Sequence, residues 1–271
     1  MRYRLEGEFA NMLHCHCSMC RKFHGSAFAT YVGAPAEGFE WISGEAEIAR
    51  YESSPGAVRT FCQRCGSPVP SPDLKGPTAF VPAGTLESDC GARPEAHIYV
   101  DSSAPWYTIS DAVPQHATTP PEWPDPGITR AVVEPETEGA IGGSCLCGSV
   151  RFEITGTPTR FANCHCSRCR HSRGAAHASN VFAALDDFRW LAGEHQVTVY
   201  DLPGADRFGA NFCRTCGSKV PRANSATGTV NVPAGCLDTD PGLTPEFHIF
   251  VADKAPWFEI RDSLPQTGAG R

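Results

Sequence analysis

The sequence predicts an all-β fold, mainly antiparallel, built from two tandem copies of one domain. Two observations lead to this prediction. Long stretches of the second half repeat the first half at a nearly constant offset. Within each copy, short runs that alternate polar and apolar residues are separated by glycine and proline, a pattern typical of half-buried strands joined by turns. An internal repeat of this length indicates one architecture used twice.

Three pairs of segments define the repeat. HCHCSMCRKFHGSAFATYV, from His14, matches NCHCSRCRHSRGAAHASNV, from Asn163, at an offset of 149. FCQRCGSPVP matches FCRTCGSKVP at an offset of 151, and PEAHIYVDSSAPWYTI matches PEFHIFVADKAPWFEI at the same offset. The second copy therefore carries two extra residues, which we place in the loop between Tyr200 and Cys213.

Strands are expected where the alternation is most regular, in residues 150–154, 196–200 and 247–251. Alternation with a period of two places every second side chain on the buried face of a sheet. Helix signals are sparse, and only a turn of helix is expected after Cys20 and after Cys169.

A segment rich in proline and acidic residues, 114–140, separates the two copies. This composition is typical of an extended linker that packs weakly. Its apolar residues, such as Trp123 and Ile128, are candidates to dock on a neighbouring domain. We therefore predict a first domain over residues 1–113 and a second over residues 141–271.

Charge and hydropathy argue against several classes of function. The 271 residues carry a formal net charge of -7 and a sequence pI of about 5.8, with no basic stripe, so a general nucleic-acid binder is not expected. No apolar stretch approaches the ~18 residues of a membrane span, and the N-terminal residues do not resemble a secretion signal. We expect a cytoplasmic protein whose 14 cysteines stay reduced, and clustered reduced cysteines more often mark metal sites than disulfides.

The clustered cysteines of the second copy divide into a group of four and a group of three. Two short pairs far apart in the sequence are the usual way to build a closed tetrahedral zinc site. A structural zinc can supply about 10–16 kcal/mol of apparent binding free energy, which becomes folding free energy. The pairs that fit this rule, and that would staple the first strand to a late turn, are Cys145, Cys147, Cys213 and Cys216.

The remaining cysteines, Cys164, Cys166 and Cys169, can hold one metal but leave a fourth coordination position open, which is the pattern of catalytic zinc. Three thiolates on Zn²⁺ leave a net negative formal charge. Such a site generates hydroxide poorly but suits a soft thiolate ligand. We predict that the open position accepts the thiol of a substrate, or a thiol adduct, and holds it as the reactive thiolate.

The first copy repeats the triplet and the late pair but begins just after the point where its Cys-x-Cys would lie. Its cysteines are Cys15, Cys17, Cys20, Cys62 and Cys65. Two explanations are open: the first domain has an incomplete structural site, or a start upstream of Met1 supplies the missing segment. We favour the second, which predicts a Cys-x-Cys shortly upstream in the reading frame. A stop codon directly before Met1 would contradict it.

Four histidines recur near the cysteines. His97 and His248 are expected on strands, as hydrogen-bonded structural residues or, alternatively, with a role near the metal. His16 and His165 lie between cysteines and are not expected to be ligands, although a hydrogen bond beside the metal site is open to them.

Basic residues flank both triplets and have two interpretations. They can bind the carboxylates of an acidic thiol, or they are solvated charges that balance an anionic site. These residues are Arg21, Lys22, Arg168 and Arg170. Cys90 and Cys236 do not recur in the other copy and are expected to be ordinary small residues.

The ordered blocks GGSCLCGSVRFEI, NCHCSRCR and FCRTCGSKVP, with HIFVADKAPW near the end, resemble the glutathione-dependent formaldehyde-activating enzyme family, which includes centromere protein V. The resemblance covers most of residues 141–265 and also residues 1–114, apart from the missing first block. It implies two tandem β-tent zinc-binding domains, each with one structural zinc and one catalytic zinc held by three cysteines.

The resemblance also implies an activity of the carbon–sulfur lyase type, because the family's namesake reaction joins formaldehyde and glutathione into S-hydroxymethylglutathione. The expected cofactor is Zn²⁺, with one catalytic ion per domain and one structural ion in the second domain. The structural site of the first domain, at Cys62 and Cys65, is incomplete. Carried over residue by residue, the catalytic-zinc ligands are Cys164, Cys166 and Cys169, with Cys15, Cys17 and Cys20 as their counterparts.

The main prediction is therefore a zinc-dependent enzyme that acts on the adduct of a small thiol, such as glutathione, and a small aldehyde. The alternative is a non-catalytic zinc-binding interaction module. The open three-cysteine site favours the enzyme, because a purely structural module has no reason to leave a coordination position empty. A thiol redox protein would show a βαβ pattern near its Cys-x-x-Cys, and none is seen. Since repeated domains can pair as subunits do, we expect a monomer with pseudo-dimeric domain pairing.

Overall fold

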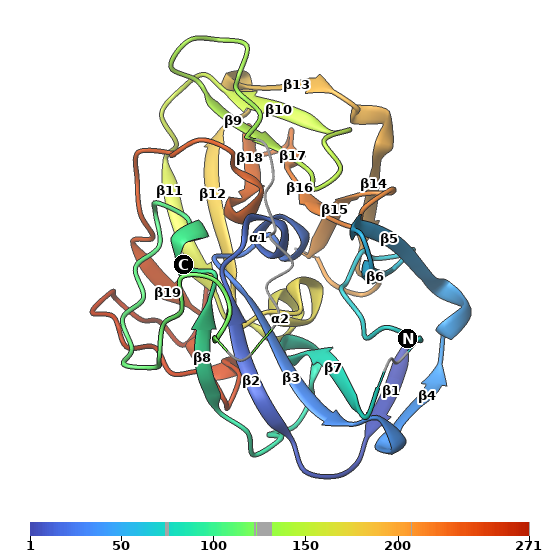
Figure 1. The fold of residues 1–271 in the computed structure, drawn as a ribbon. Helices are drawn as coiled ribbons and strands as arrows, with labels where there is room; N and C mark the ends of the chain where they lie inside the picture. Colours follow the sequence, from blue (N-terminus) through green and yellow to red (C-terminus); the bar gives the residue numbers. More distant parts are fainter. Residues whose placement is uncertain (74–75, 122, 124–131, 207, 271) are drawn as a thin grey trace.

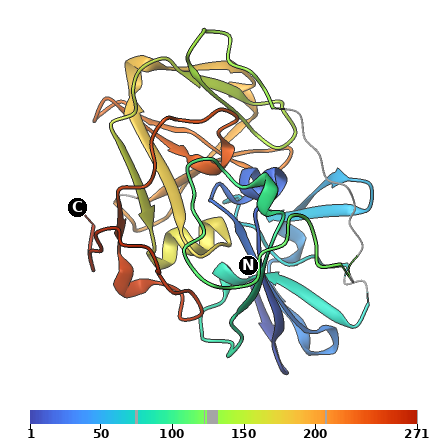
Figure 2. The ribbon, with the colours of Figure 1, turned by 60° about the vertical axis from the view of Figure 1, so that its left-hand side comes forward.

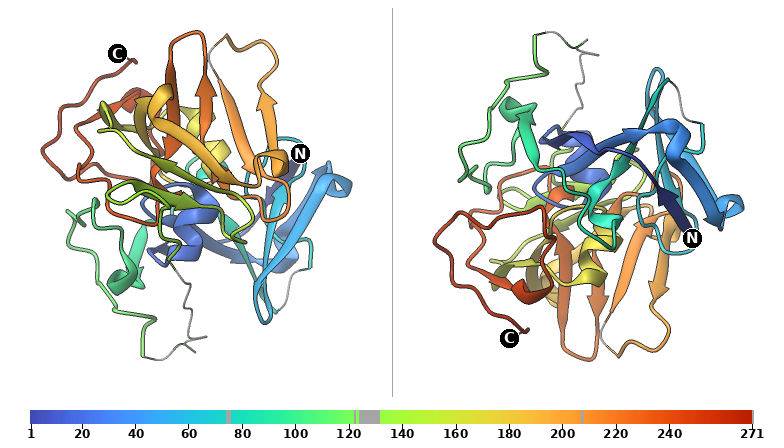
Figure 3. Two further views of the ribbon diagram at one scale, coloured as in Figure 1. Left: turned by 90° about the horizontal axis from the view of Figure 1, so that it is seen from above. Right: turned by 90° about the horizontal axis from the view of Figure 1, so that it is seen from below.

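Strands dominate the regular structure, which confirms the predicted all-β, mainly antiparallel fold (Figure 1). The structure is a computed structural model and describes residues 1–73, 76–121, 123, 132–206 and 208–270. Within these residues there are two α-helices, one in each copy of the repeat. The two copies form two halves that lie side by side, with the first drawn in blue to green and the second in yellow-green to red (Figure 3).

The first copy is built from three small sheets. A four-stranded sheet has the order β7-β3-β2-β8, and β1 pairs with β4 and β5 with β6. The strands are β1 (Arg2–Leu5), β2 (Ala10–Cys15), β3 (Ala29–Pro35), β4 (Phe39–Ser43), β5 (Ile48–Ser54), β6 (Ala57–Cys62), β7 (Thr78–Pro82) and β8 (Pro94–Ile98).

The second copy repeats this plan with additional strands. Its sheets have the orders β17-β18-β12-β11-β19, β13-β10-β9 and β14-β15-β16. The strands are β9 (Ile141–Ser144), β10 (Arg151–Ile154), β11 (Arg160–Cys164), β12 (Ala178–Ala184), β13 (Phe188–Ala192), β14 (Val197–Asp201), β15 (Gly209–Cys213), β16 (Lys219–Val220), β17 (Arg222–Asn224), β18 (Thr229–Pro233) and β19 (Phe247–Ile249).

The strands expected from alternation are present as β10, β14 and β19. The last of them ends at Ile249, two residues earlier than expected. Phe250 has a φ of 56°, in the left-handed region, and a 3-10 turn follows it. A residue in that conformation cannot continue a strand.

Two parallel pairs interrupt the antiparallel pattern, and they carry the cysteine motifs. Strand β2 pairs with β8, and β11 pairs with β19, so that Asn163 lies beside His248. The cysteine-rich segment that leaves the end of β11 is thereby attached to a strand from the end of the chain. His165 continues this ladder by donating its backbone N–H to the carbonyl of Ile249 at 3.0 Å.

The two helices begin earlier than the sequence suggested. Helix α1 spans Ser18–His24 and α2 spans Ser167–Arg173, so each contains the third cysteine of its triplet instead of following it. The physical reason is a cysteine cap: the sulfur of Cys17 or Cys166 accepts a hydrogen bond from the backbone N–H three residues later. Such a bond satisfies an amide that has no partner inside the helix.

The two copies are interlocked through these helices, which lie in the interior between the halves (Figure 2). Helix α1 packs on the 3-10 turn Ala234–Cys236 of the second copy, and α2 packs on Ala83–Thr85 of the first. A Cβ on Gly84 would lie 2.2 Å from the backbone nitrogen of Ala175. Only glycine permits such a close approach of two backbones.

The same reciprocity recurs in the aromatic contacts. The ring of Phe212 packs over Gly66, and the ring of Phe61 packs over Gly217. These are equivalent positions in the two copies, 151 residues apart. In a symmetric dimer, when residue i of one subunit contacts residue j of the other, residue j of the first subunit also contacts residue i of the second. The pairing of the copies within the chain is therefore pseudo-dimeric.

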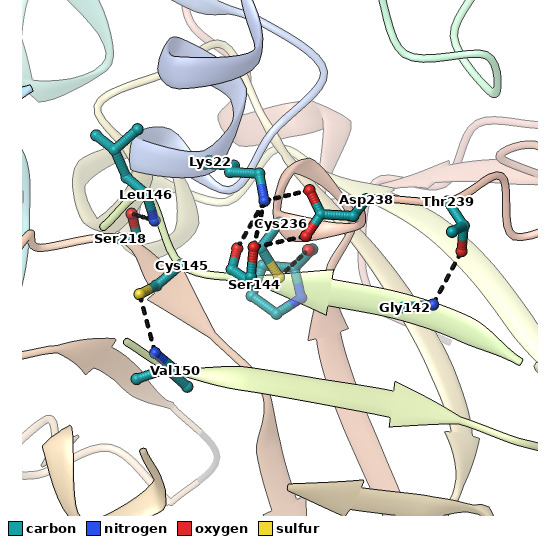
Figure 4. Close-up of polar contacts among 11 residues, drawn as sticks. Lys22, Gly142, Ser144, Cys145, Leu146, Val150, Ser218, Cys236, Asp238 and Thr239 are labelled. Carbon is teal, nitrogen blue, oxygen red and sulfur yellow. Dashed lines mark hydrogen bonds and ion pairs between the residues drawn. The ribbon is translucent and has the colours of Figure 1, made fainter. Parts of the chain in front are cut away.

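A buried ion pair joins the two copies. The ammonium of Lys22, on α1, lies 2.5 Å from a carboxylate oxygen of Asp238, and both side chains are only 3% exposed. Lys22 also donates to the backbone carbonyl of Ser144 at 3.1 Å and to its hydroxyl at 2.7 Å (Figure 4). The hydroxyl of Ser144 in turn donates to Asp238 at 2.5 Å. The first copy thus holds β9, the strand that leads to the Cys-x-Cys of the second.

The segment between the copies is anchored at both ends. Residues 114–118 hydrogen-bond to β8 and the turn after it, and the backbone N–H groups of Glu136 and Thr137 donate to Glu153 on β10. Trp123 is half-buried, while Ile128 lies outside the described residues. The division into residues 1–113, 114–140 and 141–271 stays a prediction. In the described part of the chain, no helix is long and apolar enough to cross a membrane.

Replacing Lys22 with methionine should destabilise the protein by about 3–5 kcal/mol, because it leaves the carboxylate of Asp238 buried without its cation. The matched control is Arg4→Met, which breaks an ion pair with Glu40 whose side chains are 58% and 57% exposed. This control should cost less than about 1 kcal/mol. Urea unfolding of the full chain measures both. Equal losses in the two variants would show that the buried pair does not stabilise the interface.

Candidate metal centres

Four cysteines of the second copy converge on one point. Cys145 and Cys147 follow β9, Cys213 ends β15, and Cys216 lies in the next turn. Their sulfur atoms all lie within 4.8 Å of one another. Neighbouring sulfurs are 3.4 Å apart between Cys145 and Cys147 and 3.7 Å apart between Cys147 and Cys213. Sulfurs bound about 2.3 Å from one zinc would lie about 3.8 Å apart, so the spacing fits a tetrahedral ion.

Hydrogen bonds stabilise both the cluster and its negative charge. The backbone N–H of Val150 donates to the sulfur of Cys145 at 3.3 Å, and the N–H of Leu146 donates to the hydroxyl of Ser218 at 2.9 Å (Figure 4). The second bond connects the two cysteine-bearing loops. Hydrogen bonds from the other three thiols hold the pKa of Cys147 far below its usual value. The cluster therefore keeps a thiolate, the form that binds a metal.

The three-cysteine clusters are built by a strand end and a helix start. Cys164 is the last residue of β11, Cys166 caps α2, and Cys169 lies in its first turn. The sulfur atoms of this triplet lie within 4.8 Å of one another, as do those of the equivalent triplet in the first copy. The equivalent triplet is Cys15, Cys17 and Cys20.

The electrostatics of the triplet favour a bound cation. Hydrogen bonds from Cys164 and Cys169 lower the pKa of Cys166 to about 3. Hydrogen bonds with Cys164 and Cys166, together with burial, raise the pKa of Cys169 well above its usual value. One thiolate therefore forms readily and further ionisation is opposed by like charge. A divalent soft cation relieves that repulsion, and a set of thiolates suits zinc.

A buried chain of polar side chains supports each triplet from behind. In the second copy, His165 Nε2 lies 2.8 Å from His248 Nδ1, and His248 Nε2 lies 3.1 Å from each carboxylate oxygen of Asp262. The first copy repeats this chain, with His16 and His97 2.8 Å apart. His97 and His248, which were expected to be hydrogen-bonded structural residues, both have hydrogen-bond partners.

The direction of the protons in this chain follows from the acceptor at its end. A carboxylate only accepts, so His248 Nε2 donates to Asp262, and when the ring of His248 is neutral its Nδ1 accepts from His165 Nε2. Burial, together with positively charged neighbours, lowers the pKa of His165 to about 2, so its ring is neutral. Its Nδ1 is then an unprotonated nitrogen, buried and without a hydrogen-bond partner in the described part of the chain. The chain fixes the orientation of the His165 ring between two cysteines.

A cavity of about 130 Å³ opens on Cys169. Polar and cationic side chains dominate its wall, among them Ser172, Arg173, Asn180, Lys219, Arg222 and Asn231. Arg173 donates to the side-chain carbonyl of Asn180 at 3.1 Å, while its other terminal nitrogen, Nη1, is buried and has no hydrogen-bond partner among the described residues. Burial, followed by the positive charge of Arg173, lowers the pKa of Lys219 to about 7. The cavity therefore offers the guanidinium groups of Arg173 and Arg222 to an anionic group beside the cluster.

The cationic residues that line this cavity were not predicted from the sequence, which indicated other basic residues instead. Arg21 and Arg170 donate to the backbone carbonyls of His16 and Asp253. Lys22 forms an ion pair with Asp238 at the interface between the two copies, and Arg168 is exposed. Arg173 closes the motif NCHCSRCRHSR, and its position in the last turn of α2 was the signal that could have singled it out.

Cys62 and Cys65 lie together at the end of β6, and hydrogen bonding between them lowers the pKa of Cys65 to about 5. No third cysteine, histidine or carboxylate gathers with them within residues 1–73, 76–121, 123, 132–206 and 208–270. The ammonium of Lys219, from the second copy, donates to the carbonyl of Gly66 beside them at 2.5 Å. Their role as metal ligands stays a prediction.

Replacing Cys213 with serine should lower the zinc content by about one ion per chain and destabilise the second copy by several kcal/mol, at least ~3. The matched control is Cys236→Ser, because Cys236 is equally buried but donates to the carbonyl of Pro233 outside the clusters. Elemental analysis and urea unfolding measure the two effects. About three zinc ions per parent chain are expected. Unchanged zinc in Cys213→Ser would contradict the assignment.

Comparison with known proteins matches this arrangement to one family. The sequence profile described as glutathione-dependent formaldehyde-activating enzyme matches residues 1–102 and 140–253. A Halomonas elongata protein named "putative glutathione-dependent formaldehyde-activating enzyme" is 32% identical over 130 residues, which are 44% of this chain and 80% of that protein. A crystal structure of a Rhodobacter sphaeroides protein has 29% sequence identity and a TM-score of 0.29, covering 38% of this chain and 97% of the other. The profile match extends over both copies of the repeat, and the chain belongs to the glutathione-dependent formaldehyde-activating enzyme family.

Proposed function

We propose that the second copy promotes the reversible addition of a small thiol to a small aldehyde, with glutathione and formaldehyde as the substrates. In the forward direction the thiol sulfur forms a bond to the aldehyde carbon. The carbonyl π electrons move to the oxygen, and the proton lost by the thiol ends on that oxygen as a hydroxyl. The reverse reaction breaks the carbon–sulfur bond and is of the carbon–sulfur lyase type. The family membership supports this chemistry.

The observation that carries the proposal is the opening beside Cys169. Three sulfurs that can hold one ion lie close together, and one of them, Cys169, lines a cavity whose wall includes Arg173 and Arg222. A closed structural site has four protein ligands and needs no such access. We assign zinc to Cys164, Cys166 and Cys169, and also to Cys15, Cys17 and Cys20 and to the four-cysteine cluster. Bound at Cys164, Cys166 and Cys169, zinc would supply a coordination position that holds an incoming thiol as thiolate.

The residues of the chain then bind and orient the substrate. Arg173 lines the cavity, and a guanidinium binds a carboxylate strongly. The side chains of Asn180 and Asn231 offer amide groups on the same wall. The cluster is held in place from behind by His165, His248 and Asp262.

The size of the cavity limits what it encloses. Pockets that bury a drug-sized ligand measure roughly 300–1,000 Å³, and the cavity at Cys169 is about 130 Å³. We therefore infer that it encloses the thiol end of the substrate and the aldehyde, while the rest of the thiol lies across the surface near Arg222. This residue is 35% exposed and also pairs with Asp201.

Substituting Arg173 by methionine should raise the KM for glutathione about tenfold or more and change kcat little, because a charge-assisted hydrogen bond of roughly 1.5–3 kcal/mol to the substrate is lost. The measurement is the rate of S-hydroxymethylglutathione formation above the spontaneous rate, followed by nuclear magnetic resonance. Arg160→Met, an exposed arginine on β11, is the control and should behave as the parent.

In the same assay, Cys166→Ser should remove the enzymatic rate and lower the zinc content by about one ion per chain. A parent protein that contains zinc but neither binds glutathione nor accelerates the reaction would contradict the enzyme and favour a non-catalytic zinc-binding interaction module.

A further inference from the structure

The two three-cysteine clusters are equivalent in position but differ in access. Cys15, Cys17 and Cys20 are 7%, 1% and 4% exposed. In the second copy, Cys166 and Cys169 are both partly exposed. The backbone that builds the two clusters is the same, a strand end followed by a cysteine-capped helix. The difference must therefore come from the side chains around them.

A cavity lies at the same place in each copy, but only one reaches a cysteine. The cavity of the first copy, about 310 Å³, is lined mostly by residues whose counterparts line the wall beside Cys169. Among these pairs are Tyr31 and Asn180, Val69 and Val220, and Phe80 and Asn231. Cys169 is part of the wall in the second copy, whereas no cysteine is part of it in the first.

Two side chains separate the first cavity from its cluster. Phe23, on α1, and Arg59, on β6, line the cavity at the positions taken by Ser172 and Ala210 in the second copy. Phe23 is 2% exposed. In the second copy a small side chain stands at each of these two positions. In the first copy Arg59 contacts Cys20 directly, and Phe23 belongs to the same buried cluster as Cys20.

Arg59 is held in this position by three partners. Its Nη1 donates to the sulfur of Cys20 at 3.3 Å, and its Nε donates to the hydroxyl of Ser53 at 3.2 Å. Its guanidinium lies 5.6 Å from the centre of the Phe23 ring, within the range of a cation–π contact. A guanidinium fixed in this way satisfies a thiolate of the cluster and fills the approach to it.

Charge alone would not exclude an incoming thiol, because a cation attracts an anion. Steric exclusion keeps the thiol away from the cluster, because a substrate sulfur would have to displace both the ring of Phe23 and the bound guanidinium. Arg59 also balances the net negative charge that three thiolates leave on a divalent ion. The charge of the closed cluster is thus offset without an anion from outside.

We infer that Phe23 and Arg59 close the three-cysteine cluster of the first copy, so that binding of an external thiol is confined to the second copy. This inference rests on the proposed function in one respect, the binding of glutathione at an open cluster. The closure itself is a property of the fold and is tested separately. The first copy then acts as a scaffold whose cluster stabilises the domain, and the second copy as the site of the chemistry.

The test of closure is alkylation of the zinc-loaded full chain with iodoacetamide, followed by peptide mass spectrometry. In the parent, Cys166 and Cys169 should react at least about tenfold faster than Cys17 and Cys20, because reactivity follows exposure of the thiolate. Comparable rates at the two clusters would overturn the inference, whether or not glutathione binds.

Reciprocal variants decide which residues are responsible. Phe23→Ser with Arg59→Ala copies the second site into the first and should raise labelling of Cys20 about tenfold. Ser172→Phe with Ala210→Arg should slow labelling of Cys169 by a similar factor. The single variants Arg59→Ala and Ala210→Arg serve if a double variant fails to fold. Arg50→Ala, an exposed arginine on β5, is the control and should leave both rates unchanged.

Glutathione binding to the cobalt-substituted chain, followed by the absorption of the cobalt–thiolate, completes the test. About one equivalent should bind to the parent, about two to Phe23→Ser with Arg59→Ala, and none to Ser172→Phe with Ala210→Arg. Two equivalents on the parent would overturn the closure. No binding to any variant, combined with the expected alkylation pattern, would overturn the proposed function and leave the closure intact.

Discussion

Holding several thiolates within 4.8 Å of one another is the constraint on which the rest of the structure depends. Like charges at that distance repel strongly unless a cation lies among them or hydrogen bonds offset the charge. The chain meets this demand with rigid supports. A strand end and a helix cap fix the first two sulfurs of each triplet, and the first turn of the helix fixes the third. A buried pair of histidines and an aspartate then hold the segment from behind in both copies.

The pairing of the copies follows from the same supports. A seven-residue helix is too short to be stable alone, so α1 and α2 are each held by packing on the 3-10 turn of the opposite copy. The close approach depends on Gly84 and Gly235, because a Cβ at either position would overlap the backbone of the facing segment. Each cluster therefore depends on the copy to which it does not belong. A first copy with a closed cluster would still be needed as the surface on which α2 rests.

Equivalent backbones can carry different chemistry when the side chains that face the site come from distant strands. The ligands of the two triplets lie at the same intervals in the sequence, and their clusters have the same spacing. Access differs because Arg59 and Ala210 stand at one equivalent position and Phe23 and Ser172 at another. A change at these two positions alters what can approach a cluster without altering how the cluster is built.

The sequence by itself determined the repeat, the all-β class, the family and the grouping of the cysteines, because ligand spacing and strand alternation are local properties of the chain. It placed the helices two or more residues too late, since a cysteine sulfur acting as a helix cap leaves no ordinary capping signal. Only the tertiary structure decided that Lys22 is buried against Asp238, that Arg173 faces a cavity at Cys169, and that Arg59 covers Cys20. Residues 22 and 238, or 20 and 59, are far apart along the chain, and their contact depends on how the sheets and the two copies pack rather than on any local pattern.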